Sequence, residues 1–327
     1  MKVAVTGASG LIGTALTASL RADGHQVVRL VRRPPRAGDQ NTGGQNTGGG
    51  GAASTGAVID KSTSEVRWDP RAADAGDPPL SGIDAVVHLA GAGVGDHRWT
   101  ASYKAEIRAS RVLATAALAS ALAAAQPRPK TFITASAIGW YGDTGGREVT
   151  ESAPAGKAFL SRVVHDWEAA ADPARAAGIR VAQLRSGLVL GAGGGLLGRL
   201  ATPARFGVLP RFGDGRQVMS WIALTDEIRA IRFLLDGPAA AERAGPYNLT
   251  APNAVTNGEL TAALHAAFRR PDFGWLRVPA PLLKLGLGEM SSELLTSARV
   301  RPARLLESGF AFEYPALAAA LVAELPR

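Results

Sequence analysis

The sequence has no cysteine, few lysines and no long apolar run, and each shortage excludes a class of protein. Without cysteine there is no disulfide, no thiolate nucleophile and no cysteine-ligated metal site. The apolar stretch at residues 113–125 is shorter than the roughly 20 residues of a membrane span. Only three apolar residues precede Thr6, too few for the core of a signal peptide. We therefore expect a cytoplasmic protein with no membrane partner.

The basic residues are mostly scattered arginines. Six of the 36 basic residues are lysines, so arginine dominates the net charge of +8 and the pI near 10.3. No segment interleaves basic with aromatic residues, as binders of single-stranded nucleic acid do. The five histidines lie far apart, without the spacing of metal ligands. We predict neither a nucleic-acid partner nor a metal site.

A glycine motif opens the chain and organises the segments after it. Residues 2–5 form a short apolar run typical of a buried parallel strand, and a helical pattern runs from Leu11 toward Gly24. A strand, a glycine turn and a helix N-terminus together bind a pyrophosphate through free N–H groups and a partial positive charge. The residues predicted to border it are Gly7, Ser9, Gly10, Leu11 and Ile12. The alternative is a glycine-rich turn that binds nothing.

Two arginines follow the second predicted strand, at residues 26–31. An acidic residue near this point would bind the ribose 2′-hydroxyl of NAD, whereas Arg32 and Arg33 suit the 2′-phosphate of NADP by charge and by their forked donors. The alternative is a pair of solvated arginines that open a loop. The loop is residues 34–56, a low-complexity segment that we predict to be a flexible surface insertion.

Apolar strand patterns then alternate with helical ones, which predicts a doubly wound parallel α/β sheet. The strands are expected at residues 2–5, 26–31, 65–68, 84–90, 131–136 and 181–185, and the later helices at 100–125 and 158–171. Leu89 and Ala90 end the strand at 84–90 and Gly91 follows it; we predict that these three residues border the cofactor, because open α/β sheets bind ligands at their carboxyl edge. His88, inside this apolar run, is expected to pack in the core rather than to bind a ligand.

The regular alternation loosens beyond Gly193. We expect one more strand near residues 247–249, a helix at 225–235 with Thr225 as N-cap, and a second helix capped by Thr256 or Asn257. The alternating aromatics Phe310, Phe312 and Tyr314 are expected to pack a small C-terminal subdomain.

Several motifs resemble those of the extended short-chain dehydrogenase/reductase superfamily. They are the glycine motif, Val87-His88-Leu89-Ala90-Gly91 and Arg185-x-Gly187-x-Val189-x-Gly191. A second set resembles the atypical, sugar-nucleotide-epimerase-like branch that has a C-terminal domain of unknown function. It comprises Trp99 with Arg111, residues 137–142, His165-Asp166-Trp167-Glu168, Ser220-Trp221-Ile222 and the pattern at residues 301–315.

The resemblance covers nearly the whole chain except residues 34–56. It implies a Rossmann domain that binds NADP(H), placed at residues 1–190. It also implies a smaller α+β substrate domain at 191–327, some segments of which return to the Rossmann core. We expect a small-molecule substrate and a monomer or a homodimer.

The superfamily's usual catalytic pair is missing. That mechanism needs a tyrosine as general acid/base, a lysine one helical turn later that lowers its pKa, and a serine that orients the substrate. No Tyr-x-x-x-Lys occurs, and Leu160 and Val164 stand at the corresponding positions. Arg111 stands where an asparagine is expected.

Two hydroxyl groups remain as catalytic candidates. Ser136 could orient the substrate oxygen and Tyr141 could act as the acid, assisted by the nicotinamide ribose or by a basic residue such as Arg111. Alternatively, Ser136 caps a turn and Tyr141 is structural.

Two functions stay open at this point. One is an NADP(H)-dependent oxidoreductase or epimerase that acts on a carbonyl or hydroxyl compound by hydride transfer. The other is a protein that holds NADP(H) structurally or as a redox sensor without turnover.

Overall fold

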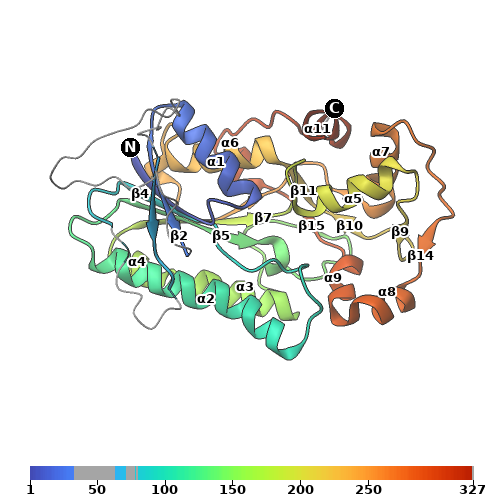
Figure 1. Cartoon of the computed structure of the whole chain (residues 1–327), viewed down its shortest axis with the longest axis horizontal. Helices are drawn as coiled ribbons and strands as arrows, with labels where there is room; N and C mark the ends of the chain where they lie inside the picture. The colour runs from blue at the N-terminus through green and yellow to red at the C-terminus, as the bar shows by residue number, and fades with distance from the viewer. Residues whose placement is uncertain (33–62, 71–77, 79, 326–327) are drawn as a thin grey trace, which may run out of the picture.

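Seven parallel strands form the central sheet (Figure 1). The computed structural model describes residues 1–32, 63–70, 78 and 80–325. The strand order is β12-β7-β5-β4-β1-β2-β3, and every neighbouring pair is parallel. The strands are β1 (Lys2–Thr6), β2 (Gln26–Val31), β3 (Thr63–Arg67), β4 (Ala85–His88), β5 (Thr131–Ala137), β7 (Arg180–Ser186) and β12 (Gly245–Leu249). The predicted doubly wound α/β fold is confirmed.

Helices cover both faces of this sheet (Figure 1). On one face lie α1 (Leu11–Ala22) and α6 (Leu224–Leu235), and on the other lie α2 (Ala101–Ala124), α3 (Phe159–Ala169) and α4 (Asp172–Ala176). Because side chains alternate along a strand, Val3 and Val5 pack toward α1 while Ala4 packs toward α2. The strands β1 and β4 are buried on both faces and have apolar runs at residues 3–5 and 85–87, which is why they were visible in the sequence.

Two boundaries differ from the sequence-based expectation. The helix expected at 158–171 is α3, which ends at Ala169, and the separate short helix α4 follows it, with Pro173 in its first turn, where a missing N–H is tolerated. The strand proposed near residues 247–249 is β12, which pairs with β7 and completes the sheet at its edge.

Among the described residues, α2 is the one helix long and apolar enough to cross a membrane by length and composition. The sequence-based expectation that no apolar stretch approaches the length of a membrane span therefore does not hold for α2. Leu118 and Leu122 of α2 are fully buried in the cluster that packs against the sheet. The fold thus already uses the apolar face of this helix.

Part of the C-terminal half packs around Trp221, which is fully buried. Its helices are α5 (Gly195–Arg205), α7 (Asn257–Ala267), α8 (Ala280–Leu287), α9 (Ser291–Leu295), α10 (Ala303–Glu307) and α11 (Leu317–Glu324). Short strands form four further pairs. They are β8 (Leu188–Leu190) with β11 (Trp221–Ala223), β9 (Arg211–Phe212) with β14 (Arg277–Val278), β10 (Val218–Met219) with β13 (Val255–Thr256), and β6 (Glu148–Val149) with β15 (Arg299–Val300).

One predicted helix cap is confirmed and one is wrong. Thr256 caps α7 in a capping box with Glu259. Thr225 does not cap α6, whose N-cap is Ala223; instead, the Glu324 carboxylate accepts a hydrogen bond from the Thr225 N–H at 2.8 Å. The cap comes from a helix 99 residues away in the sequence, so no local pattern could show it.

The C-terminal aromatics do not share one environment. Phe310 packs edge-on against Phe233 of α6, with ring centroids 5.4 Å apart, and it also contacts Phe312 at 4.9 Å. Both phenylalanines belong to the core cluster under α1 and α6, whereas Tyr314 packs with α5, α7 and α11. The prediction that these aromatics pack a small C-terminal subdomain was therefore wrong for Phe310 and Phe312.

Candidate functional site

The glycine turn is fixed by close contact with the end of β4. Gly7 has φ +67°, and a Cβ on it would lie 2.7 Å from the Leu89 carbonyl carbon and 2.8 Å from the Ala90 nitrogen. A Cβ on Gly13 would lie 2.2 Å from the Gly7 carbonyl oxygen. Only glycine lets β1, α1 and β4 approach this closely.

The N-terminus of α1 offers unpaired donors at this turn. Gly10 is the N-cap and provides no side chain to bond the first N–H groups, which include those of Leu11 and Ile12. Ser9 and Gly10 are exposed, and nothing but the Gly7 carbonyl lies within 4 Å of a Cβ built on Gly10. The turn can therefore receive an anionic group from solvent.

Arg32 follows β2, the strand next to β1. It is exposed and makes no ion pair with any described residue. Its place beside the glycine turn is the one expected for a 2′-phosphate ligand. Arg33 and the insertion at 34–56 lie outside the described residues.

The two catalytic candidates join one buried hydrogen-bond network. Ser136 Oγ donates to Glu168 Oε1 at 2.6 Å, and Arg185 pairs with both oxygens of Glu168 at 2.8 and 2.9 Å. Arg185 also donates to the Tyr141 hydroxyl at 3.1 Å, and that hydroxyl donates to Asn248 Oδ1 at 2.6 Å. All five side chains are buried, so the network links β5, α3, β7 and β12.

Two family profiles together match most of the chain. The profile of the NAD dependent epimerase/dehydratase family matches residues 3–250, and that of DUF1731, a domain of unknown function, matches residues 278–324. The chain belongs to the NAD dependent epimerase/dehydratase family.

Relatives of this epimerase family chain include proteins from distant organisms. An epimerase family protein of Mycobacterium leprae is 39% identical over 320 residues, covering 98% of this chain and 94% of that protein. The crystal structure of human epimerase family protein SDR39U1 (isoform 2), solved with NADPH, superposes with a TM-score of 0.82 at 31% identity and covers 99% of both chains. UDP-N-acetylglucosamine 4-epimerase from Bacillus cereus reaches a TM-score of 0.72 at 20% identity, a likeness of fold alone.

Apolar contacts occupy the place where the superfamily's tyrosine and lysine are expected in this epimerase family chain. A Cβ built on Gly139 would lie 3.5 Å from Leu160 Cβ and 3.7 Å from Val164 Cγ2. Leu160 and Val164 of α3 thus pack beneath the turn that follows β5, and neither can transfer a proton.

Tyr141 is not activated as a base in this arrangement. Burial raises the pKa of its hydroxyl above the ordinary value of 10.0, and the neighbouring Arg185 only partly offsets this rise. The cation beside Tyr141 is Arg185, whose Cζ lies 5.4 Å from the Tyr141 ring centroid, rather than Arg111. Glu168 and Arg185 were visible only as parts of the family motifs, which carried no hint that they form an ion pair.

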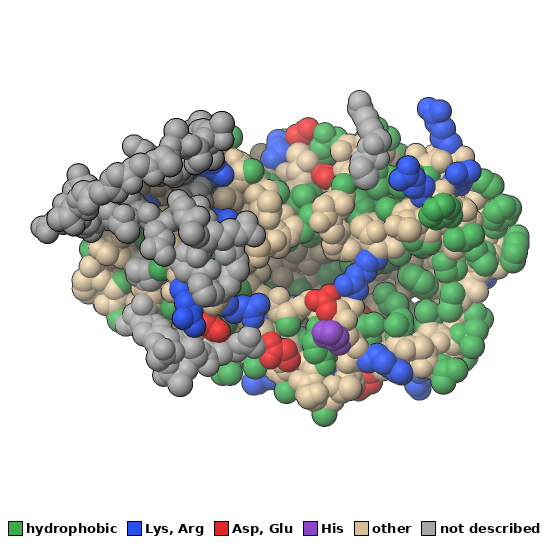
Figure 2. All heavy atoms as spheres, in the orientation of Figure 1, with side chains coloured by type: hydrophobic (Ala, Val, Ile, Leu, Met, Phe, Trp, Pro, Cys, Tyr) green, Lys and Arg blue, Asp and Glu red, His purple; other side chains and the backbone are tan. Residues whose placement is uncertain are grey.

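In Figure 2 the face is hollowed between the sheet-bearing half and the half that holds α5, α7 and α8. Surface contacts between described residues cross between the halves. Arg199 pairs with Asp96 at 2.7 Å, Lys104 with Glu289 at 2.7 Å, and Arg98 donates to the Leu285 carbonyl at 3.3 Å. The loop after β4 and the start of α2 are thereby tied to the C-terminal half, next to Gly91.

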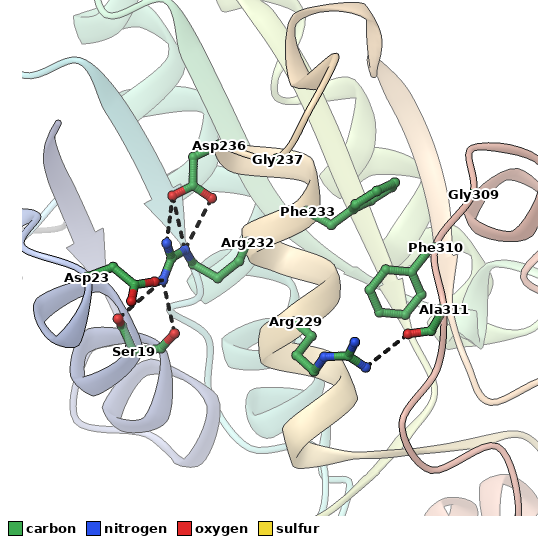
Figure 3. Close-up of a pocket in the computed structure, with 10 residues that line it drawn as sticks. All are labelled: Ser19, Asp23, Arg229, Arg232, Phe233, Asp236, Gly237, Gly309, Phe310 and Ala311. Carbon is green, nitrogen blue, oxygen red and sulfur yellow. Dashed lines mark hydrogen bonds and ion pairs between the residues drawn. The ribbon is translucent and has the colours of Figure 1, made fainter.

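A pocket of about 490 Å³ lies elsewhere, between the C-terminal ends of α1 and α6 and residues 309–311 (Figure 3). Its charged groups bind one another: Arg232 pairs with Asp236 and Asp23, each at 2.8 Å, and Arg229 donates to the Ala311 carbonyl at 2.9 Å. The C-terminal end of α1 is far from the glycine turn at its other end, so this pocket is separate from the candidate site.

Two fully buried side chains have shifted pKa values. Burial lowers the pKa of His88 to about 4, and its Nδ1 lies 2.6 Å from Thr6 Oγ1. Burial raises the pKa of Glu227 to about 8, although Ser186 Oγ donates to its Oε1 at 2.6 Å. His88 therefore packs in the core, as the sequence predicted, and Glu227 is protonated at neutral pH.

Stability is expected to depend on pH through Glu227. Above its ordinary pKa of 4.5 the unfolded chain loses a proton that the folded chain keeps up to about pH 8, so stability falls across this window. The slope reaches about 1.4 kcal/mol per pH unit. His88 acts oppositely: its contribution is present above 6.5 and is lost as pH falls toward about 4. Below about pH 6.5 the opposite effects of His88 and Glu227 on stability cancel. Above about pH 6.5 the loss of stability due to Glu227 remains.

The test compares the wild type with Glu227→Gln, which keeps an acceptor for Ser186 but does not titrate. Denaturant unfolding at several pH values should show the variant gaining stability relative to the wild type as pH rises from about 5 to about 8. Curves that stay parallel over this range would mean that Glu227 is ionised in the folded chain.

Proposed function

We propose that this chain binds NADP(H) at the carboxyl edge of its sheet and transfers hydride between the nicotinamide and a carbonyl or hydroxyl group of a small molecule. The observation that supports it most is the uncapped N-terminus of α1, held open by Gly7 and Gly13 against the end of β4. This cradle fits a pyrophosphate. The bound nicotinamide would supply the hydride, and the chain's residues would bind and orient both reactants.

Cofactor choice is assigned to Arg32. Its guanidinium, unpaired within the described part of the chain, offers forked donors and a full charge to a 2′-phosphate. The sequence places no carboxylate directly after β2 to bind a 2′-hydroxyl. The human relative whose structure contains NADPH supports the same choice.

Calorimetric titration of cofactor-stripped protein tests this assignment. NADPH should bind at least tenfold more tightly than NADH, a difference of about 1.4 kcal/mol. In Arg32→Gln the preference should shrink while NADH affinity stays the same. Arg21→Gln, on the outer surface of α1, is the matched control and should keep the preference. Equal affinities of the wild type for NADPH and NADH would mean that Arg32 does not bind the 2′-phosphate. Failure to bind either nucleotide would overturn the proposed function.

A second function is favoured by a specific observation. Leu160 and Val164 replace the acid/base pair, and the Tyr141 hydroxyl is held by Asn248 and Arg185. A chain with these features could hold NADP(H) without turnover. Mixing the NADPH-bound protein with a pool of carbonyl metabolites separates the two functions: loss of the reduced nicotinamide absorbance supports hydride transfer, and persistence of the absorbance supports the binding protein.

A further inference from the structure

Arg111 of α2 lies beside the candidate site with no counter-ion among the described residues. A Cβ on Gly91 would lie 3.3 Å from Arg111 Cζ, so the guanidinium packs directly against this glycine, in the loop that follows β4. Its other neighbours are the Trp167 ring, 5.2 Å from Cζ, and the Ile107 carbonyl, which accepts a hydrogen bond from Nη1 at 3.1 Å. The side chain therefore fills the space between α2 and α3 at the carboxyl edge of the sheet.

The charge of Arg111 is not compensated by the described part of the chain. No carboxylate there pairs with it, whereas Arg185 pairs with Glu168 and Arg108 pairs with Asp166. Burial lowers the pKa of Arg111, as expected for a cation without an anionic partner. Arg111 is partly buried, and holding an unpaired charge even partly out of water is unfavourable unless a ligand supplies the opposite charge.

The position of Arg111 indicates which bound molecule would supply the negative charge that pairs with it. The donors at the N-terminus of α1 suit the pyrophosphate of the cofactor, and Arg32 suits its 2′-phosphate. Arg111 is a third cationic position, beside Gly91 and the Trp167 ring of α3, and it therefore calls for a further anion. Guanidinium nitrogens bind carboxylate and phosphate oxygens in a planar, two-bond geometry.

We propose that Arg111 binds an acidic group, a carboxylate or a phosphate, of the small-molecule substrate. The inference rests on the proposed function and narrows its substrate class to acidic carbonyl or hydroxyl compounds. Arg111 is a binding and positioning residue in this role: it anchors one end of the substrate so that the other end meets the nicotinamide.

The experiment titrates the NADP-loaded protein with inorganic phosphate and, separately, with acetate, at constant ionic strength. Heat is recorded by calorimetry, and tryptophan emission is recorded because Arg111 stacks on Trp167. The wild type should show saturable binding of at least one anion, and Arg111→Gln should weaken it at least tenfold. Arg111→Lys should retain part of it. Arg108→Gln, an exposed arginine of the same helix, is the matched control and should bind like the wild type.

Three outcomes would overturn the proposal. One is equal anion binding by the wild type and Arg111→Gln, and another is no binding by the wild type. The third is a tenfold loss of NADPH affinity in Arg111→Gln, which would assign Arg111 to the cofactor. Failure of the proposed function is distinguishable, because the anion titration can be repeated on cofactor-free protein. Thermal unfolding checks that Arg111→Gln folds.

Discussion

Replacing Arg185 by methionine should lower the free energy of unfolding by about 3–5 kcal/mol, because it leaves a buried carboxylate without its counter-ion. Arg185 and Glu168 are 3% and 9% exposed at their side chains, and their closest atoms are 2.8 Å apart. The loss is measured by denaturant unfolding at neutral pH. Methionine roughly fills the volume of the stem, so the missing charge rather than a cavity dominates the effect.

Two further variants make this result interpretable. Arg108→Met breaks the exposed pair with Asp166, whose side chains are 51% and 37% exposed, and should cost less than about 1 kcal/mol. The double variant Arg185→Met/Glu168→Leu removes both charges and should recover most of the stability. If Arg185→Met were no more harmful than Arg108→Met, the ion pair would not hold β7 to α3.

Gly7→Ala is expected to lower NADPH affinity at least tenfold, about 1.4 kcal/mol, and to destabilise the fold. The left-handed backbone itself costs an alanine about 1–2 kcal/mol. In addition, the new Cβ would meet the backbone of Leu89 and Ala90 at 2.7 and 2.8 Å, which cannot move aside as a flexible side chain can. Displacing this contact would distort the turn that presents the α1 N-terminus.

Gly24→Ala is the matched control for this prediction. Gly24 also has positive φ, +77°, but nothing would lie within 4 Å of a Cβ at this position. Gly24→Ala should therefore lower the free energy of unfolding only by the backbone cost of about 1–2 kcal/mol and should leave NADPH affinity unchanged. Unfolding curves and calorimetry on both variants separate the two effects. Equal behaviour of Gly7→Ala and Gly24→Ala would mean that the close approach of β4 has no part in cofactor binding.

The local parts of the site were predictable because their signals are local. The positive φ of Gly7 and the short run from β1 to α1 require particular residue types within 13 positions of the chain start. The strands β1 and β4 were visible because their apolar runs at residues 3–5 and 85–87 are typical of strands covered on both faces. β12 was harder to predict because its residues, Gly245 to Leu249, include glycine, proline and asparagine.

The sequence by itself determined the fold class, the glycine turn and the absence of Tyr-x-x-x-Lys. Only the tertiary structure decided what surrounds the remaining candidates: Ser136 bonds Glu168, and Tyr141 bonds Asn248, 107 residues away. It also decided that Arg185 has a carboxylate partner while Arg111 has none within the described chain. Two arginines look alike in a sequence, and a charge becomes structural or available only through the partners that distant segments bring to it.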